Sequence, residues 1–211
     1  MNTTVPALLV VDVQRDFLPG GALAVPHGDE VVEVINRIES LYDVILATQD
    51  WHPADHCSFA ANHPSHSPGE VIDLGGVPQI LWPTHCVQGS AGAAFAQGLK
   101  VDRFQKVFHK GTDPAVDSYS AFFDNARRRS TGLGEYLKAH NLADIHVCGL
   151  ATDYCVVWSV LDALDLGFSV TVVRDACRGI DLQPGDSDRA LAKAAAAGAR
   201  LVTSAELGRA A

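Results

Sequence analysis

Cys155 is the residue whose position most clearly suggests chemistry. An apolar run ends at Gly149, a short Ala-Thr-Asp turn follows, and a helical pattern then begins at Cys155. Such a position places a sulfur at a helix N-terminus, where backbone N–H groups and the helix dipole favour a thiolate and a developing oxyanion. Most cysteines are buried packing residues instead, and Cys148 inside the apolar run fits that description. We therefore interpret Cys155 as a candidate nucleophile.

Two further side chains at strand ends complement this thiol. Asp12 lies at the end of an apolar run over residues 7–13, and Lys110 follows a short run at 107–108. A carboxylate can accept a thiol proton, and an ammonium lowers the thiol pKa and holds the carboxylate in place. The Asp/Lys pair alone would be interpreted as an ordinary ion pair. With Cys155 beside it, the set predicts a nucleophile and a base without a histidine.

A second group has the composition of a metal site. Asp50 and His52 leave a strand end on the same side, because side chains alternate in extended chain, and His85 comes from a distant loop. Two histidines and one carboxylate suit Zn²⁺, Fe²⁺ or Mn²⁺, and sequence does not choose among them. His56 lies in the same segment and is left open, either as a further ligand or as a residue behind the ligands.

Four aromatic residues lie beside these motifs. Phe17, Trp82 and Tyr119 fall in predicted loops, outside any helical stripe, and Tyr154 immediately precedes the cysteine. Core packing is the common role of such residues. Loop aromatics near the edge of a sheet can instead enclose a flat ring, so the pattern leaves both interpretations open.

Predicted strands and helices alternate along the chain, and this order determines where the candidate residues meet. Apolar runs predict six strands, at residues 7–13, 43–48, 107–108, 145–148, 169–173 and 201–203. Helical patterns lie at residues 31–41, 133–140, 156–166 and 186–197. The alternation predicts the α/β class, as a three-layer α/β/α sandwich on a mostly parallel six-stranded sheet. In such sheets ligands bind beyond the carboxyl ends of the strands, so the candidate side chains are expected at one edge.

Length and composition set the domain organisation. The 211 residues, 47% hydrophobic and 19% charged, suit a single globular domain over 1–211 with a sizeable core. Residues 50–104 differ, because they are rich in Pro, Gly and His and show little periodicity. Segments of that length without regular elements are usually functional or mobile. We expect an insertion there that carries metal-binding and substrate-binding loops.

Charge and cysteine usage exclude several classes of partner. The net charge is −9, and the prominent basic cluster, residues 127–129, is expected to be a solvated surface, so no nucleic-acid partner is predicted. The apolar stretch 7–11 is too short for a signal peptide or membrane span. Five cysteines without CxxC spacing indicate free thiols and a cytoplasmic location.

Taken together, these segments resemble a known family. The matching stretches are LLVVDVQRDFLPGGAL (8–23), ATQDWHPADHCSF (47–59), WPTHCVQGSAGA (82–93), FHKGTD (108–113), the stretch around Tyr119, and GLATDYCV (149–156). In this order they resemble the nicotinamidases and pyrazinamidases of the isochorismatase-like hydrolase (cysteine hydrolase) superfamily. The pair DWH and WPTHC narrows the resemblance from the superfamily to this group.

The resemblance implies a role for each candidate residue. It implies Asp12, Lys110 and Cys155 as the catalytic triad, and Asp50, His52 and His85 as ligands of one divalent metal, zinc first, with iron or manganese as alternatives. It implies that the Leu150–Ala151 bond is the family's cis peptide and that the N–H groups of Ala151 and Cys155 form an oxyanion hole. It implies a ring pocket lined by Phe17, Trp82, Tyr119 and Tyr154.

The implied activity is hydrolysis of nicotinamide to nicotinate and ammonia through a cysteine thioester, with pyrazinamide as a further substrate, in NAD salvage. The oligomeric state and the preference among pyridine and pyrazine carboxamides stay open. Three alternatives have their own signatures. A related amidohydrolase for ureido or carbamoyl substrates needs no ring-nitrogen ligand. A non-haem iron oxygenase shares the ligand set but leaves Cys155 and Lys110 without roles. A non-catalytic scaffold that kept the fold would not need a complete triad and ligand set.

Overall fold

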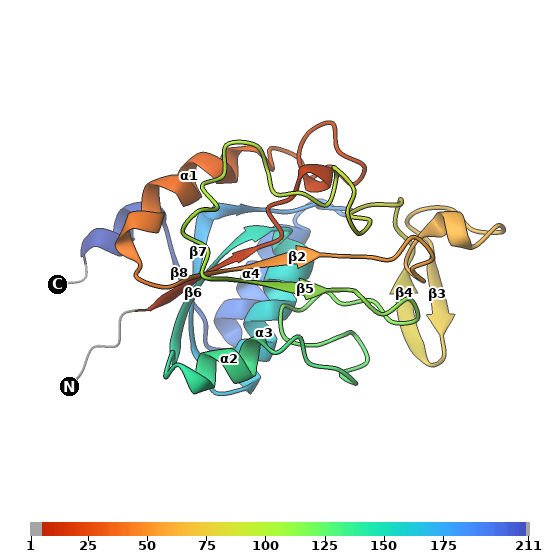
Figure 1. Cartoon of the computed structure of the whole chain (residues 1–211). Helices are drawn as coiled ribbons and strands as arrows, with labels where there is room; N and C mark the ends of the chain where they lie inside the picture. Colours follow the sequence, from red (N-terminus) through yellow and green to blue (C-terminus); the bar gives the residue numbers. More distant parts are fainter. Residues whose placement is uncertain (1–5, 210–211) are drawn as a thin grey trace.

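A parallel sheet of six strands forms the centre of the protein in a computed structural model that describes residues 6–209 (Figure 1). Its order is β5-β2-β1-β6-β7-β8, and every neighbouring pair is parallel. The strands are β1 (Ala7–Val11), β2 (Ile45–Asp50), β5 (Lys106–Lys110), β6 (Asp144–Leu150), β7 (Ser169–Arg178) and β8 (Arg200–Val202). The predicted fold class and the mostly parallel six-stranded sheet are confirmed.

Helices cover both faces of this sheet, as Figure 1 shows. They are α1 (Glu30–Ile38), α2 (Leu133–Ala139), α3 (Val157–Asp165) and α4 (Asp186–Ala196). In α1 the buried residues Val31, Ile35 and Ile38 recur at helical spacing, so one face packs on the sheet while the charged face meets water. Because α1 covers one face and α2, α3 and α4 the other, the central strands are buried on both sides. This explains the continuous apolar runs of β1 and β6.

The strand order reverses between β1 and β6. From β1 the chain adds β2 and then β5 on one side of the sheet, and from β6 it adds β7 and β8 on the other. Connections that leave adjacent strands in opposite directions open a crevice at their carboxyl ends, where ligands bind in open α/β sheets. Asp12 directly follows β1, and Cys155 lies five residues beyond the end of β6.

The segment 50–104 contains regular structure that the sequence analysis did not predict. Strands β3 (Val71–Leu74) and β4 (Val77–Ile80) form an antiparallel hairpin apart from the main sheet. Gly75 and Gly76, both with positive φ, make its two-residue turn, a residue pair typical of tight hairpins. The expectation of little regular structure was wrong here because each strand has only four residues. Within residues 6–209, no helix has the length and apolarity needed to span a membrane.

Candidate active site

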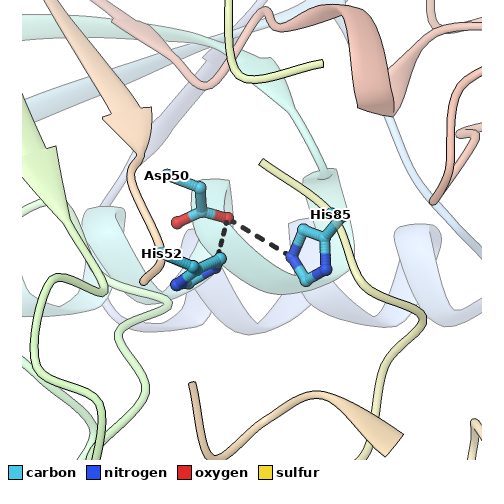
Figure 2. A group of neighbouring side chains, drawn as sticks. All are labelled: Asp50, His52 and His85. Carbon is cyan, nitrogen blue, oxygen red and sulfur yellow. Dashed lines mark ion pairs between the residues drawn. The ribbon is translucent and has the colours of Figure 1, made fainter. Parts of the chain in front are cut away.

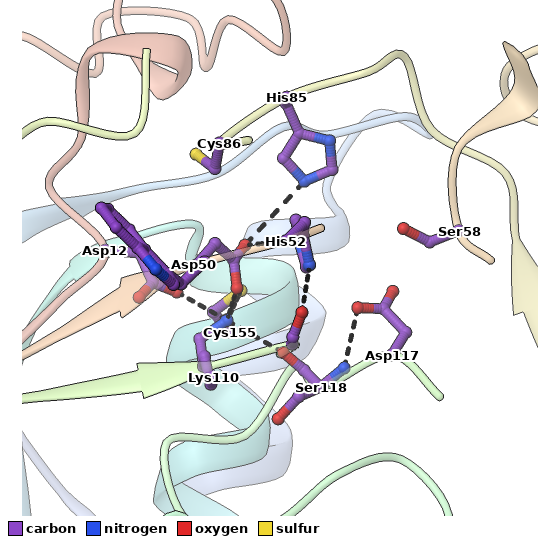
Figure 3. Close-up of polar contacts among 12 residues, drawn as sticks. Asp12, Asp50, His52, Ser58, His85, Cys86, Lys110, Asp117, Ser118 and Cys155 are labelled. Carbon is purple, nitrogen blue, oxygen red and sulfur yellow. Dashed lines mark hydrogen bonds and ion pairs between the residues drawn. The ribbon is translucent and has the colours of Figure 1, made fainter. Parts of the chain in front are cut away.

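Three side chains from distant parts of the chain meet at this crevice (Figure 3). Asp12 has a positive φ of 48° immediately after β1, and Lys110 is the last residue of β5. Cys155 lies in a single π-helical turn (Thr152–Val156) between β6 and α3. The structure thus brings the predicted triad together from positions 12, 110 and 155.

The Lys110 ammonium connects the members of this group. Its Nζ lies 2.9 Å from Asp12 Oδ2 and 3.4 Å from Cys155 Sγ, and it forms an ion pair with Asp50 Oδ1. It also donates a hydrogen bond to the Ser118 carbonyl, at 2.9 Å. The lysine is 2% exposed, so one cation serves two buried carboxylates and a sulfur away from water. Burial alone would lower the pKa of Lys110, but Asp12 and Asp50 outweigh it and hold the ammonium charged.

The thiol of Cys155 is protonated in this environment. Burial raises its pKa well above the ordinary value, and Lys110 offsets only part of that effect. The sequence-based expectation that the turn favours a thiolate was therefore wrong for the resting protein, because desolvation of the sulfur outweighs nearby positive charge. A buried neutral thiol needs a base before it can act as a nucleophile.

Asp12 has the properties of such a base. Burial raises its pKa to about 6, although Lys110 and a hydrogen bond from Thr48 work in the opposite direction. The Thr48 hydroxyl donates to Asp12 Oδ1 at 2.6 Å, which leaves Oδ2 for the lysine and the sulfur. A carboxylate with this pKa is ionised at neutral pH and is more basic than an ordinary aspartate.

Lys110 also has a large expected effect on stability. Lys110→Met leaves the buried carboxylates of Asp12 and Asp50 without their cation, so the free energy of unfolding should fall by about 3 kcal/mol or more. Urea denaturation of the metal-free protein measures it. Lys106→Met, at an exposed position of the same strand, is the matched control and should cost less than about 1 kcal/mol. Wild-type stability of Lys110→Met would contradict this account of the ion pairs.

The predicted metal ligands also converge (Figure 2). Asp50 ends β2, His52 follows two residues later, and His85 comes from the loop after β4. Asp50 Oδ2 lies 3.6 Å from His52 Nε2 and 3.9 Å from His85 Nε2, and one ligand atom from each residue falls within 4.8 Å of the others. All three side chains are buried.

Backbone carbonyls orient both imidazoles. His52 Nδ1 lies 2.8 Å from the Gly111 carbonyl, and His85 Nδ1 lies 2.8 Å from the Pro83 carbonyl. Because a carbonyl only accepts, each Nδ1 donates, and each Nε2 can offer its lone pair to a metal ion held between the rings and Asp50. Burial and the neighbouring His52 lower the pKa of His85 to about 4, so its ring is neutral at physiological pH. The donor set therefore fits a divalent metal ion that accepts nitrogen and carboxylate ligands.

Gly111 is required by the packing of this group. It has a φ of +62°, and a Cβ at this position would lie 2.2 Å from Cε1 of His52. A side chain here would displace a candidate ligand, so the glycine allows β5 to approach the imidazole.

His56 and Asp117 lie beside His52. The His56 ring centroid is 4.1 Å from that of His52, and its Nε2 is buried without a hydrogen-bond partner. Asp117 forms a second group of potential metal-binding atoms with these two histidines, and Gln79 Nε2 donates to its Oδ2 at 2.9 Å. The sequence pattern left the role of His56 open and did not mark Asp117, because Asp117 belongs to an irregular stretch without a recognisable spacing.

A pocket joins the two groups of residues. All four predicted aromatic side chains line it. The same pocket is also lined by Asp50, His85, Asp117, Ala151 and Cys155. Trp82 Nε1 donates to the Tyr119 hydroxyl at 3.3 Å, and Tyr154 packs edge-on against Trp82 at a centroid distance of 5.0 Å. The Leu150–Ala151 bond is cis, as the resemblance implied. The arrangement can hold a flat ring between candidate metal ligands and a nucleophilic sulfur.

Comparison with known proteins agrees with this geometry. The isochorismatase domain model matches residues 6–206. The chain belongs to the isochorismatase family. It is 52% identical over 206 residues to the nicotinamidase of Escherichia coli, covering 95% of each chain.

Solved structures support the same grouping. The chain resembles an Acinetobacter baumanii nicotinamidase and pyrazinamidase with a TM-score of 0.94 and 42% identity, over 98% of this chain and 100% of the other. The pyrazinamidase of Pyrococcus horikoshii, solved in complex with zinc, has a TM-score of 0.75 and 37% identity over 95% of this chain and 99% of its own. The resemblance drawn from the sequence and the expectation of an enzyme are confirmed.

Proposed function

We propose that this enzyme is a metal-dependent amidohydrolase that converts nicotinamide to nicotinate and ammonia through a thioester on Cys155. The observation that carries the proposal is the single pocket that contacts the four aromatic residues, two candidate metal ligands and the candidate nucleophile. The nicotinamidase of Escherichia coli, at 52% identity, supports the choice of substrate. Pyrazinamide, which keeps a ring nitrogen and a carboxamide in a similar outline, is proposed as a second substrate.

Asp50, His52 and His85 are the residues that would hold a divalent metal, for which we propose zinc because the Pyrococcus horikoshii relative binds it. When bound, the ion supplies a coordination position for the pyridine nitrogen and withdraws electron density from the ring. Phe17, Trp82, Tyr119 and Tyr154 would enclose the two faces of that ring and exclude water. Together these contacts would direct the carboxamide toward Cys155.

Formation of the thioester begins with proton transfer from the Cys155 thiol to Asp12. The sulfur attacks the carboxamide carbon, and the negative charge that develops on oxygen is stabilised by the backbone N–H groups of Ala151 and Cys155, at about 3 kcal/mol for each donor. Asp12 returns the proton to the amide nitrogen, the C–N bond breaks and ammonia leaves. Lys110 stabilises both the aspartate and the sulfur while they carry negative charge.

Hydrolysis of the thioester uses the same base. Asp12 accepts a proton from a water molecule, whose oxygen attacks the thioester carbonyl. The C–S bond breaks, the sulfur recovers its proton from Asp12, and nicotinic acid leaves and loses its proton to solvent to become nicotinate. Every proton taken is thus given back within one turnover, and the enzyme returns to its resting form with a neutral Cys155 thiol.

The wider setting completes the proposal. We propose a single domain over 1–211 in which residues 50–104 form an insertion that supplies substrate and metal contacts. We further propose a cytoplasmic enzyme that generates nicotinate for NAD salvage, with small molecules as its partners and a homo-oligomer left open.

The direct test is ammonia release from nicotinamide, with metal analysis of the same sample. We expect turnover together with about one divalent ion per chain. Turnover of ureido or carbamoyl compounds without turnover of nicotinamide would favour the related amidohydrolases, and oxygen consumption would favour an oxygenase. A purified, metal-loaded protein that does none of these would be a non-catalytic relative.

Removal of the metal should chiefly weaken substrate binding. In verified metal-free enzyme we expect the KM for nicotinamide to rise at least tenfold, because the ring nitrogen loses its ligand, and re-addition of zinc should restore it. His85→Ala should reproduce the loss, whereas His66→Ala, at an exposed histidine, should not. An unchanged KM in metal-free enzyme would contradict coordination of the ring nitrogen.

A further inference from the structure

Asp153 lies inside the turn that carries Cys155, and it is tied to a separate loop. Its Oδ1 accepts a hydrogen bond from the Ile180 N–H at 3.0 Å, and its Oδ2 accepts one from the Asp181 N–H at 2.7 Å. These two bonds join the turn after β6 to the loop after β7, across 27 and 28 residues of sequence. Hydrogen bonds from backbone N–H groups to a carboxylate are among the stronger ones in proteins.

The same loop is held on its other side by α4. The Asp181 carboxylate accepts hydrogen bonds from the Ser187 N–H and hydroxyl, both at 2.8 Å. A Cβ on Gly179 would lie 1.9 Å from Ser187 Oγ and 2.9 Å from Asp153 Oδ1, so a side chain here would displace the side chains of both residues. The loop is therefore positioned by close contacts at three consecutive residues, 179–181.

The loop that Asp153 holds contains Ile180, which is a residue of the pocket. Its side chain lines the cavity together with Tyr154 and Cys155, which belong to the same turn as Asp153, and with Ala151, which directly precedes that turn. Most of the other lining residues come from the loops after β1, β4 and β5. Asp153 thus connects the wall formed by Ile180 to the turn that carries the sulfur.

We propose that Asp153 is a positioning residue that holds the Ile180 wall at a fixed place beside Cys155 and so determines how tightly a flat heteroaromatic carboxamide is bound. The inference rests on the proposed function. Asp153 does not line the pocket, and it acts through Ile180.

The proposal predicts a particular split of the kinetic constants. A wall that touches the ring contacts substrate and transition state alike, so its loss raises KM and leaves kcat nearly unchanged. If Asp153 instead acted on the sulfur or on Asp12, its substitution would lower kcat. The substitution would then also slow alkylation of Cys155 by iodoacetamide, a small reagent that does not need the contact with Ile180.

The experiment compares Asp153→Asn with Asp186→Asn in the metal-loaded enzyme. Asp186 also accepts a hydrogen bond from this loop, from the Gln183 N–H at 2.8 Å, but it lies outside the pocket that holds Cys155, which makes it a matched control. For Asp153→Asn we expect the KM for nicotinamide to rise about tenfold, with kcat and the iodoacetamide rate within about threefold of wild type. For Asp186→Asn we expect wild-type constants.

A double-mutant cycle with Ile180→Ala tests whether Asp153 affects KM through Ile180. Ile180→Ala alone should raise KM, and adding Asp153→Asn should raise it little further, because the wall is already gone. The proposal would be overturned if the rise of KM in the double variant equalled the product of the rises in the two single variants. A loss of kcat and of the iodoacetamide rate in Asp153→Asn would also overturn it. Asp153→Ser, which keeps one acceptor oxygen, is measured alongside in case Asp153→Asn does not fold. A wild-type enzyme without nicotinamide turnover would overturn the proposed function itself, whereas an active wild type with an unchanged Asp153→Asn would overturn only this inference.

Discussion

Cys155→Ala should reduce ammonia release from nicotinamide by about 10⁴-fold or more, because no other group in the pocket can form the covalent intermediate. The pocket walls and candidate metal ligands remain in this variant, so nicotinamide should still bind. Calorimetric titration measures the binding, and a coupled ammonia assay measures the turnover. Loss of turnover with binding retained separates a missing nucleophile from a collapsed pocket.

Cys148→Ala is the matched control for this variant. Cys148 is a fully buried thiol on β6, seven residues before Cys155, and it lies outside the pocket. Its replacement should cost some stability through lost packing but leave turnover near the wild-type level. Substantial turnover by Cys155→Ala would remove the thioester from the mechanism and point to direct attack by water.

The strand ends explain why so much of this site could be predicted from the sequence. Asp12, Asp50 and Lys110 each follow or end an apolar run, and parallel strands bring their carboxyl ends to one edge. Element boundaries shifted by a few residues, as in β7, which extends to Arg178 although the apolar run suggested an end at 173. Such shifts did not affect the site, because the candidate side chains depend on strand order and direction.

Contacts between loops could not be predicted from the sequence, because they depend on the paths of the loops and not on a periodic pattern. Asp117 meets His56 and Gln79 through segments without periodicity, so no spacing marked the three residues as neighbours. The attachment of Asp153 to the 180–181 backbone depends on the exact path of a loop, which residue types alone do not determine. The protonation state of Cys155 was missed because it depends on burial, and burial is a property of the assembled site.

Asp12→Asn should remove the base and with it most of the reactivity of the thiol. The amide keeps the size of the carboxylate but cannot accept the Cys155 proton, so kcat/KM should fall by about 10³-fold or more. In the wild type, kcat/KM should decline as pH falls through about 6, because Asp12 takes up a proton there and can no longer accept one from the thiol. The variant should lack this decline, and a pH profile of both proteins tests it.

Alkylation of Cys155 by iodoacetamide separates this role from an effect on substrate binding. Without Asp12 the buried thiol stays protonated near neutral pH, so its alkylation rate should fall together with turnover. Asp102→Asn, at an exposed aspartate, should change neither rate. Removal of one negative charge beside Lys110 would by itself favour the thiolate, so that effect alone would speed alkylation. A faster rate in Asp12→Asn would therefore identify Asp12 as a charge that restrains the sulfur, and a slower one identifies it as the base that activates it.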